Sequence, residues 1–177
     1  GIMTMIAEVL GLLGDETSQK ELIGMTSFHS RYVRGQAALG LLVAAPTAEH
    51  VALVGRMADE DATEFVRVKA SLALVLAGKG GAPCGERIAR IAREAADGFD
   101  RAVAVESLGI AGDRKHSAAV EAALGDQDEY ARLCAVDAME RLGGPAARKT
   151  AAAALNDGSA RVRLQGAKSI VAAGEGK

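Results

Sequence analysis

The sequence repeats a short pattern of residues at a nearly constant interval. Each copy has an Arg, a small residue at plus three, an aliphatic residue at plus seven and usually a Gly at plus eleven. The clearest copy is Ala131 to Gly143, ARLCAVDAMERLG. Counted from the Arg, the copies start at positions 3, 34, 67, 101, 132 and 163, the first with Met in place of Arg. A period in this range is typical of stacked repeats that bury their apolar surfaces against one another.

A second apolar pattern lies between successive copies. In Gly112 to Asp126, the residues Ala119, Val120, Ala123 and Leu124 recur at the three- and four-residue spacing of one helix face. Each repeat is therefore predicted to be a pair of helices. We expect an all-α protein, a right-handed α-solenoid of about five helix pairs preceded by a lone N-terminal helix.

The repeat also determines the expected domain organisation. Because it runs through the whole chain, we expect a single domain over residues 1–177. A chain that opens in mid-repeat is consistent with a segment of a longer protein. The open first and last repeats lack evident polar caps, so self-association through the ends is one possible consequence.

Composition narrows the classes of partner and compartment. The net charge of −2 comes from well-mixed positive and negative residues, which argues against nucleic-acid binding. No apolar run reaches the roughly 18 residues that cross a bilayer, so no membrane partner is expected. Cys84 and Cys134 lie fifty positions apart and cannot form the disulfide framework of a small secreted domain. We therefore expect a cytoplasmic protein.

The motif resembles the HEAT repeats, in particular the HEAT-like repeats named after phycobilisome lyases. The residues that carry the resemblance are the Val-Arg pairs at 33–34, 66–67 and 162–163, together with the preceding Asp and the following Ala, Leu and Gly. In that family the turn Asp and this Arg form a ladder along the stack. The resemblance implies a structural ladder of three pairs: Asp61 with Arg67, Asp126 with Arg132, and Asp157 with Arg163.

The resemblance also implies which surface is free to bind. In HEAT-type stacks, the side of the second helix that faces away from the core lines the concave surface. Here it comprises offsets minus two, plus two, plus five and plus nine from each Arg. Four of the five aromatic residues share the minus-two offset. The candidate partner-binding residues on this side are Tyr32, Gln36, Leu39, Phe65, Lys69, Leu72, Phe99, Val103, Glu106, Tyr130 and Asp137.

Three interpretations of this apolar, aromatic side remain open. It can be a groove that grips an apolar or helical segment of another protein, since soluble monomers rarely leave large apolar patches bare. It can also be a self-association surface. In the third interpretation the aromatic residues simply pack against neighbouring turns of the superhelix. We predict a protein–protein interaction scaffold of unidentified partner, without catalytic residues and hence not an enzyme.

The candidates for chemistry are few. Cys134 and Asp137 lie one helical turn apart, but a carboxylate raises rather than lowers the pKa of a thiol. They support only an alternative function, a bilin lyase-like subunit or a chaperone of a cofactor-bearing protein. The glycine-rich stretch before Cys84 lacks the GxxxxGK[ST] order and is interpreted as a lengthened loop. His29, His50 and His116 show no ligand spacing, so neither a metal nor a cofactor is expected.

Overall fold

The computed structural model describes residues 2–175, with side chains from residue 2 to residue 172. The described chain is helical, with no strand among these residues. It forms two compact units, residues 1–88 and 89–177, which divide within the sixth helix. Each unit is described by itself below.

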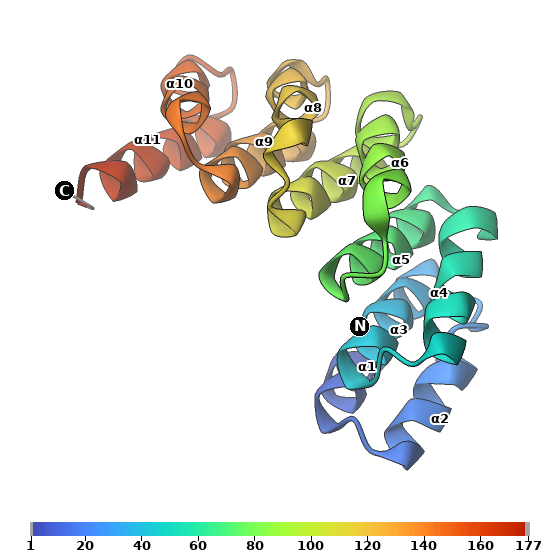
Figure 1. Cartoon of the computed structure of the whole chain (residues 1–177). Helices are drawn as coiled ribbons and strands as arrows, with labels where there is room; N and C mark the ends of the chain where they lie inside the picture. The colour runs from blue at the N-terminus through green and yellow to red at the C-terminus, as the bar shows by residue number, and fades with distance from the viewer. Residues whose placement is uncertain (1, 176–177) are drawn as a thin grey trace. The chain divides into compact units, whose positions relative to one another are not determined.

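The first unit places three equivalent helices side by side. Its helices are α1 (Ile2–Leu13), α2 (Glu16–Met25), α3 (Arg31–Ala44), α4 (Ala48–Glu60), α5 (Glu64–Leu76) and the first part of α6 (Gly81–Glu94). Helix α3 packs between α1 and α5, while α2 and α4 lie together on one side of that row (Figure 1). The opposite side of α1, α3 and α5 has no covering helix within the unit, and we call it the free side.

The second unit repeats this arrangement. After the rest of α6 come α7 (Gly98–Ala111), α8 (Ser117–Ala122), α9 (Glu129–Leu142), α10 (Pro145–Ala154) and α11 (Ala160–Glu175). Two 3-10 turns, Arg114–His116 and Ala123–Gly125, flank the short α8. Helix α9 packs between α7 and α11, and α10 packs against both α9 and α11. Here the free side is the corresponding side of α7, α9 and α11.

Local sequence signals define the helix ends. Side-chain oxygens of Thr47, Thr63, Asp97 and Asp128 accept hydrogen bonds from backbone N–H groups in the first turns of α4, α5, α7 and α9. Such caps satisfy donors that have no partner within the helix. At the other end of α7, Gly112 adopts φ 72°, a left-handed conformation that glycine accepts without steric cost.

Small residues allow the equivalent helices to approach closely. A Cβ on Gly40 would lie 2.8 Å from the backbone oxygen of Ala7 on α1, and a Cβ on Gly109 would lie 2.5 Å from Cα of Ala138 on α9. Larger side chains at these points would force the helices apart. Leu41 on α3 and Leu108 on α7 are among the large side chains that are fully buried.

The fold predicted from the sequence is confirmed as an all-α solenoid. A lone helix, α1, precedes five successive helix pairs, from α2–α3 to α10–α11. Equivalent helices stack side by side within each unit, as the repeat requires. That the whole chain forms one continuous domain stays a prediction, as does the handedness. No helix in the described part of the chain is long and apolar enough to cross a membrane.

Candidate functional site

A ladder of arginine–aspartate pairs joins neighbouring repeats. Arg34 donates from Nε and Nη2 to the carboxylate of Asp61, at 2.8 and 3.0 Å. The second unit has two such pairs, Arg101–Asp126 at 2.7 Å for both bonds and Arg132–Asp157 at 2.8 and 3.1 Å. Two parallel bonds of this kind are the geometry that an arginine and a carboxylate favour.

The predicted partners within the ladder were wrong. We expected Asp61 with Arg67, Asp126 with Arg132, and Asp157 with Arg163, which are all pairs inside one repeat. Each Asp instead accepts from the Arg of the preceding repeat. Arg67 pairs with Glu64 on its own helix at 3.1 Å, and Arg163 donates to the backbone oxygens of Asp157 and Gly158.

The geometry of Arg132 explains this register. Its Nη1 donates to the backbone oxygens of Asp126 and Gln127, in the turn that precedes its own helix. Its Nε and Nη2 donate to the carboxylate of Asp157, in the turn between the two helices of the next repeat. One guanidinium therefore joins two successive turns. The equivalent bond from Arg101 is the main reason why the pKa of Asp126 lies below its ordinary value.

Two of the three Phe and Tyr residues of the first unit form a packed pair. The rings of Tyr32 and Phe65 meet edge to face, with centroids 5.0 Å apart. Arg31 lies within 6 Å of both ring centroids, and Lys69 lies 6.0 Å from that of Phe65. Phe65 is only 7% exposed, because it also packs on the bare backbone of Gly35. Tyr32 remains exposed beside it.

Three of the candidate binding residues are buried. Phe65 on α5, Leu72 on α5 and Val103 on α7 have almost no exposed surface. This corrects the expectation that they line an open surface, and it agrees for Phe65 with packing between neighbouring turns. In the second unit, Phe99 is half-buried and stacks on the exposed Tyr130 with centroids 6.1 Å apart. The candidates Gln36, Leu39, Lys69, Glu106 and Asp137 are half-buried, and their role in binding stays a prediction.

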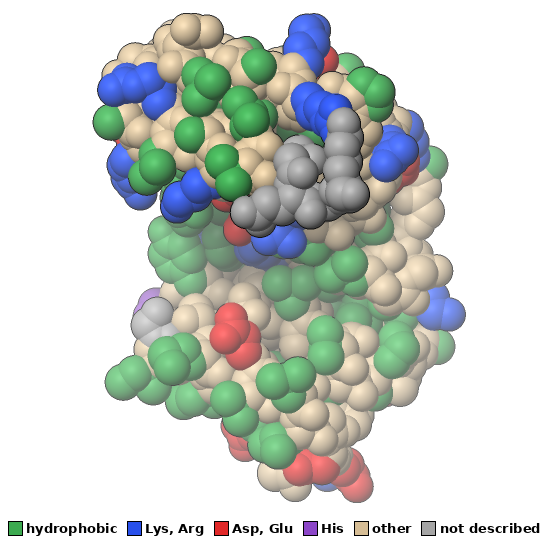
Figure 2. All heavy atoms as spheres, turned by 90° about the vertical axis from the view of Figure 1, so that its left-hand side faces the viewer, with side chains coloured by type: hydrophobic (Ala, Val, Ile, Leu, Met, Phe, Trp, Pro, Cys, Tyr) green, Lys and Arg blue, Asp and Glu red, His purple; other side chains and the backbone are tan. Residues whose placement is uncertain are grey.

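An exposed aliphatic row crosses the free side of the first unit. Leu12, Val43 and Leu76 share the plus-nine offset on α1, α3 and α5, and they are 80%, 61% and 54% exposed. A shallow apolar pocket of ≈ 130 Å³ lies between α3 and α5. Its lining is Leu39, Leu42, Val43, Ala73, Leu76 and Ala77. Figure 2 looks at this side, and hydrophobic side chains are exposed over part of it.

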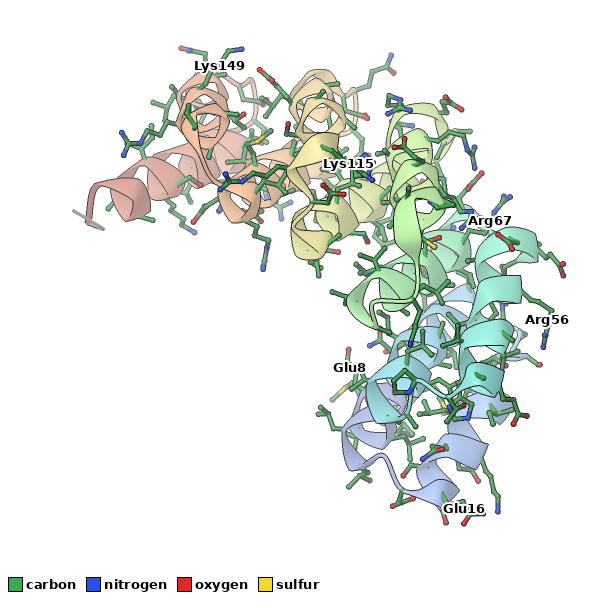
Figure 3. The ribbon with its side chains drawn as sticks, viewed as in Figure 1. Glu8, Glu16, Arg56, Arg67, Lys115 and Lys149 are labelled. Atoms are coloured by element: carbon green, nitrogen blue, oxygen red, sulfur yellow. The ribbon has the colours of Figure 1, made fainter. Side chains whose placement is uncertain are left out.

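Sequence reasoning placed the plus-nine offset on the concave side, but of these residues it named only Leu39 among the candidates for partner binding. The signal was nevertheless present, because plus nine from Met3, Arg34 and Arg67 gives an aliphatic residue each time. Glu8 is the charged residue of α1 and lies on the same free side of that helix (Figure 3). The row is therefore bordered by a carboxylate at one end.

Cys134 and Asp137 lie together in a small pocket of the second unit. The pocket, ≈ 70 Å³, is lined by Glu106, Tyr130, Leu133, Cys134, Asp137, Ala138 and Arg141. Burial raises the pKa of the Cys134 thiol to about 12, and the Glu106 carboxylate adds to the effect. A thiol in this state is a poor nucleophile at neutral pH. The geometry gives no support to a covalent role for Cys134 in a lyase.

The three histidines lie apart from one another. Nδ1 of His50 lies 2.7 Å from the backbone oxygen of Ala45, at the start of α4. His116 is buried beside α8, and His29 is exposed next to Phe28. Among the described residues there is no group of three or more His, Cys, Asp or Glu side chains placed to hold a metal ion.

A pocket of ≈ 680 Å³ lies where α9, α10 and α11 meet. Its lining includes Gly143, Gly144, Arg148, Glu140 and Ser169. Ser169 donates to the carboxylate of Glu140. Sequence reasoning did not single out this site, because its residues come from three helices and share no motif.

Comparison with known proteins identifies the architecture. No protein-family model matches the sequence, and no curated protein matches it either. Among solved structures, the chain is similar to human deoxyhypusine hydroxylase in complex with glycerol, with a TM-score of 0.54 and 18% sequence identity. The match covers 93% of this chain and 65% of that one, so this chain spans slightly less than two thirds of its length. That protein is an all-helical HEAT-repeat protein.

This similarity contradicts one expectation. The sequence led us to expect that the chain is not an enzyme, yet a protein of the same fold is a hydroxylase by name. At 18% identity the similarity shows the shared fold. The prediction of a chain without enzymatic activity is therefore withdrawn.

Proposed function

We propose that the free side of the first unit binds a polypeptide segment of another protein. The observation that carries the proposal is the exposed aliphatic row of Leu12, Val43 and Leu76 on three adjacent helices. Exposed apolar surface that continues over several elements is characteristic of interaction sites in soluble proteins. The pocket between α3 and α5 provides a recess for a side chain of the segment.

The spacing of the row suggests the form of the segment. Adjacent packed helices lie about 8 to 10 Å apart, so the three aliphatic side chains should follow one another at about that interval. In an α-helix, residues i and i+7 are about 10.5 Å apart along the axis and lie on the same face. An amphipathic helix with apolar residues at this spacing would match the row.

The same free side has a different chemistry at its other end. Tyr32, which is exposed, lies near the N-terminal end of α3, with Arg31 beside its ring. The aliphatic row lies near the C-terminal ends of the same helices. A segment bound across α3 and α5 would therefore meet an aliphatic surface on one flank and an aromatic hydroxyl on the other. This asymmetry would orient the segment.

Selection from a displayed library of amphipathic peptides of about 20 residues would test the proposal. Peptides are selected on the native chain and then counter-selected on a Val43→Asp, Leu76→Asp double variant. We expect enriched peptides to carry apolar residues at i and i+7 and to bind the double variant at least about tenfold more weakly, equivalent to about 1.4 kcal/mol.

A matched control uses Leu155→Asp, which places the same charge on a comparably exposed leucine of the second unit. This variant should keep full affinity. Circular dichroism would establish that all variants remain helical. If the enriched peptides bind the native chain and the double variant equally well, the free side of the first unit is not the binding site and the proposal fails.

A further inference from the structure

The pocket between α3 and α5 is lined entirely by aliphatic side chains among the described residues, and we call it the aliphatic recess. Its volume is ≈ 130 Å³. Three of its lining residues belong to α3 and three to α5 and its C-terminal end: Leu39, Leu42 and Val43, then Ala73, Leu76 and Ala77. A charged or polar group placed in the recess would lose its hydration without gaining a side-chain hydrogen bond, which is costly.

Two alanines leave room in the recess. Ala73 is buried and Ala77, which follows the last residue of α5, is half-buried. An alanine side chain ends at Cβ, so the space that a longer side chain would fill stays open. At the plus-ten offset of Ala77, α9 carries Leu142, which is buried, and the pocket between α7 and α9 does not extend to it. The small residue at plus ten is therefore a feature that distinguishes the recess.

The equivalent place in the second unit has a different chemistry. The pocket between α7 and α9 shares three offsets with the aliphatic recess, namely plus five on the first helix and plus six and plus nine on the second. These offsets carry Leu39, Ala73 and Leu76 in the recess, and Glu106, Ala138 and Arg141 in the second unit. The repeat forms a hollow at both places, so the side chains at plus five and plus nine decide what each hollow accepts.

We propose that Ala73 and Ala77 make the aliphatic recess selective for one Leu, Ile or Met side chain of the bound segment. This inference rests on the proposed function, because it concerns the segment that the free side of the first unit binds. A closed apolar cavity of about 150 Å³ holds a benzene molecule. A recess of ≈ 130 Å³ therefore holds a branched or flexible aliphatic side chain and excludes the larger indole ring of Trp. An Ala side chain would leave it mostly unfilled and lose the contacts of the missing atoms.

A peptide library tests the proposal on the whole chain. The parent peptide is an amphipathic helix of about 20 residues with apolar residues at i, i+7 and i+14. Each apolar position is randomised in turn to every natural residue, and the peptides are selected on the native chain. At one of these positions we expect Leu, Ile and Met to be enriched at least about tenfold over Ala, Trp and the charged residues, because of the additional carbon atoms buried.

Two variants change the size of the recess in opposite directions. Ala77→Leu fills it, so the preference at that peptide position should move to Ala and Gly. Leu39→Ala enlarges it, so the preference should move to Phe and Trp. The matched control is Ala111→Leu, the same substitution at the plus-ten offset of α7 in the second unit, which should keep the native preference. Circular dichroism would establish that each variant remains helical, and two opposite changes keep the test decisive if one variant does not fold.

The outcomes separate this inference from the proposed function. If the peptides bind the native chain and lose affinity for the Val43→Asp, Leu76→Asp double variant, but show the same residue preference on the native chain and on both recess variants, the selectivity is wrong and the binding surface stands. If no peptide binds the native chain, both proposals fail. A native chain that self-associates in sedimentation velocity, and is monomeric as Ala77→Leu, would show that a second copy fills the recess and would also overturn the inference.

Discussion

The two units have the same helical frame but present different free sides. At the plus-nine offset, the first unit carries Leu12, Val43 and Leu76, whereas the second carries Ile110, Arg141 and Ala172. At plus five, the first unit has Leu39 and Leu72 after Glu8, while the second has Glu106, Asp137 and Lys168. The first unit is therefore suited to apolar contacts on this side, and the second presents charge.

The difference shows which positions the fold leaves free. Both units keep small residues where equivalent helices approach, and both keep the Arg–Asp pairs between repeats. The plus-nine offset points away from these contacts and can change without disturbing the stack, whereas at plus five Leu72 is buried. Similarity of fold therefore says little about what either surface binds.

The largest expected effect comes from the close helix contacts that the units share. Gly40→Ala in the first unit and Gly109→Ala in the second place a Cβ within 3 Å of neighbouring backbone atoms. Each should lower the free energy of unfolding by about 2 to 3 kcal/mol, measured by urea denaturation. Gly55→Ala, where no atom lies within 4 Å, should raise it by up to about 1 kcal/mol. If only one of the Gly40→Ala and Gly109→Ala variants is destabilised, close approach of equivalent helices at a glycine is not a shared feature of the two units.

The next effect concerns the Arg–Asp pairs. Arg34→Met and Arg101→Met leave Asp61 and Asp126 without their main partners, so each should cost about 2 to 3 kcal/mol at pH 7. Because the pKa of Asp126 is lowered in the folded state, the stability it supplies is present above its unfolded pKa of about 3.9. It is lost as the pH falls through the lower, folded value.

The difference between native chain and Arg101→Met should therefore shrink steadily on acidification below about pH 4. Urea denaturation at several pH values would measure it. Lys149→Met removes an exposed pair with Glu121 and should leave the free energy of unfolding nearly unchanged at any pH. A difference that stays constant down to about pH 2 would mean that the pair does not act through the ionised Asp126.

The smallest effect compares the two thiols and involves no change in stability. Burial raises the pKa of both Cys84 in the first unit and Cys134 in the second, the latter to about 12. Arg87, 4.0 Å from the Cys84 sulfur, partly offsets the shift there. Using Cys84→Ser and Cys134→Ser chains at about pH 8, we expect disulfide reagents to modify Cys84 faster than Cys134. Both thiols should react rapidly in urea. A Cys134 that reacts faster than Cys84 in the folded chain would contradict this expectation.

Some contacts could not be predicted because they depend on placement between repeats. The Asp six residues before each Arg suggested a pair inside one turn, but the guanidinium binds carbonyls there and reaches the next turn for its carboxylate. Phe65 shared its offset with exposed residues, yet the missing side chain of Gly35 allows its ring to be buried. Neither contact can be deduced from the spacing of the sequence repeat alone.

The sequence by itself determined the repeat, the helix pairs and the positions of their turns, because spacing and capping act between residues close along the chain. It also determined that the plus-nine offset of the first unit is aliphatic in each repeat. The tertiary structure decided which arginine meets which aspartate and which aromatic rings are buried. These features depend on how closely neighbouring helices approach, and that distance is fixed by pairs of small residues about thirty positions apart.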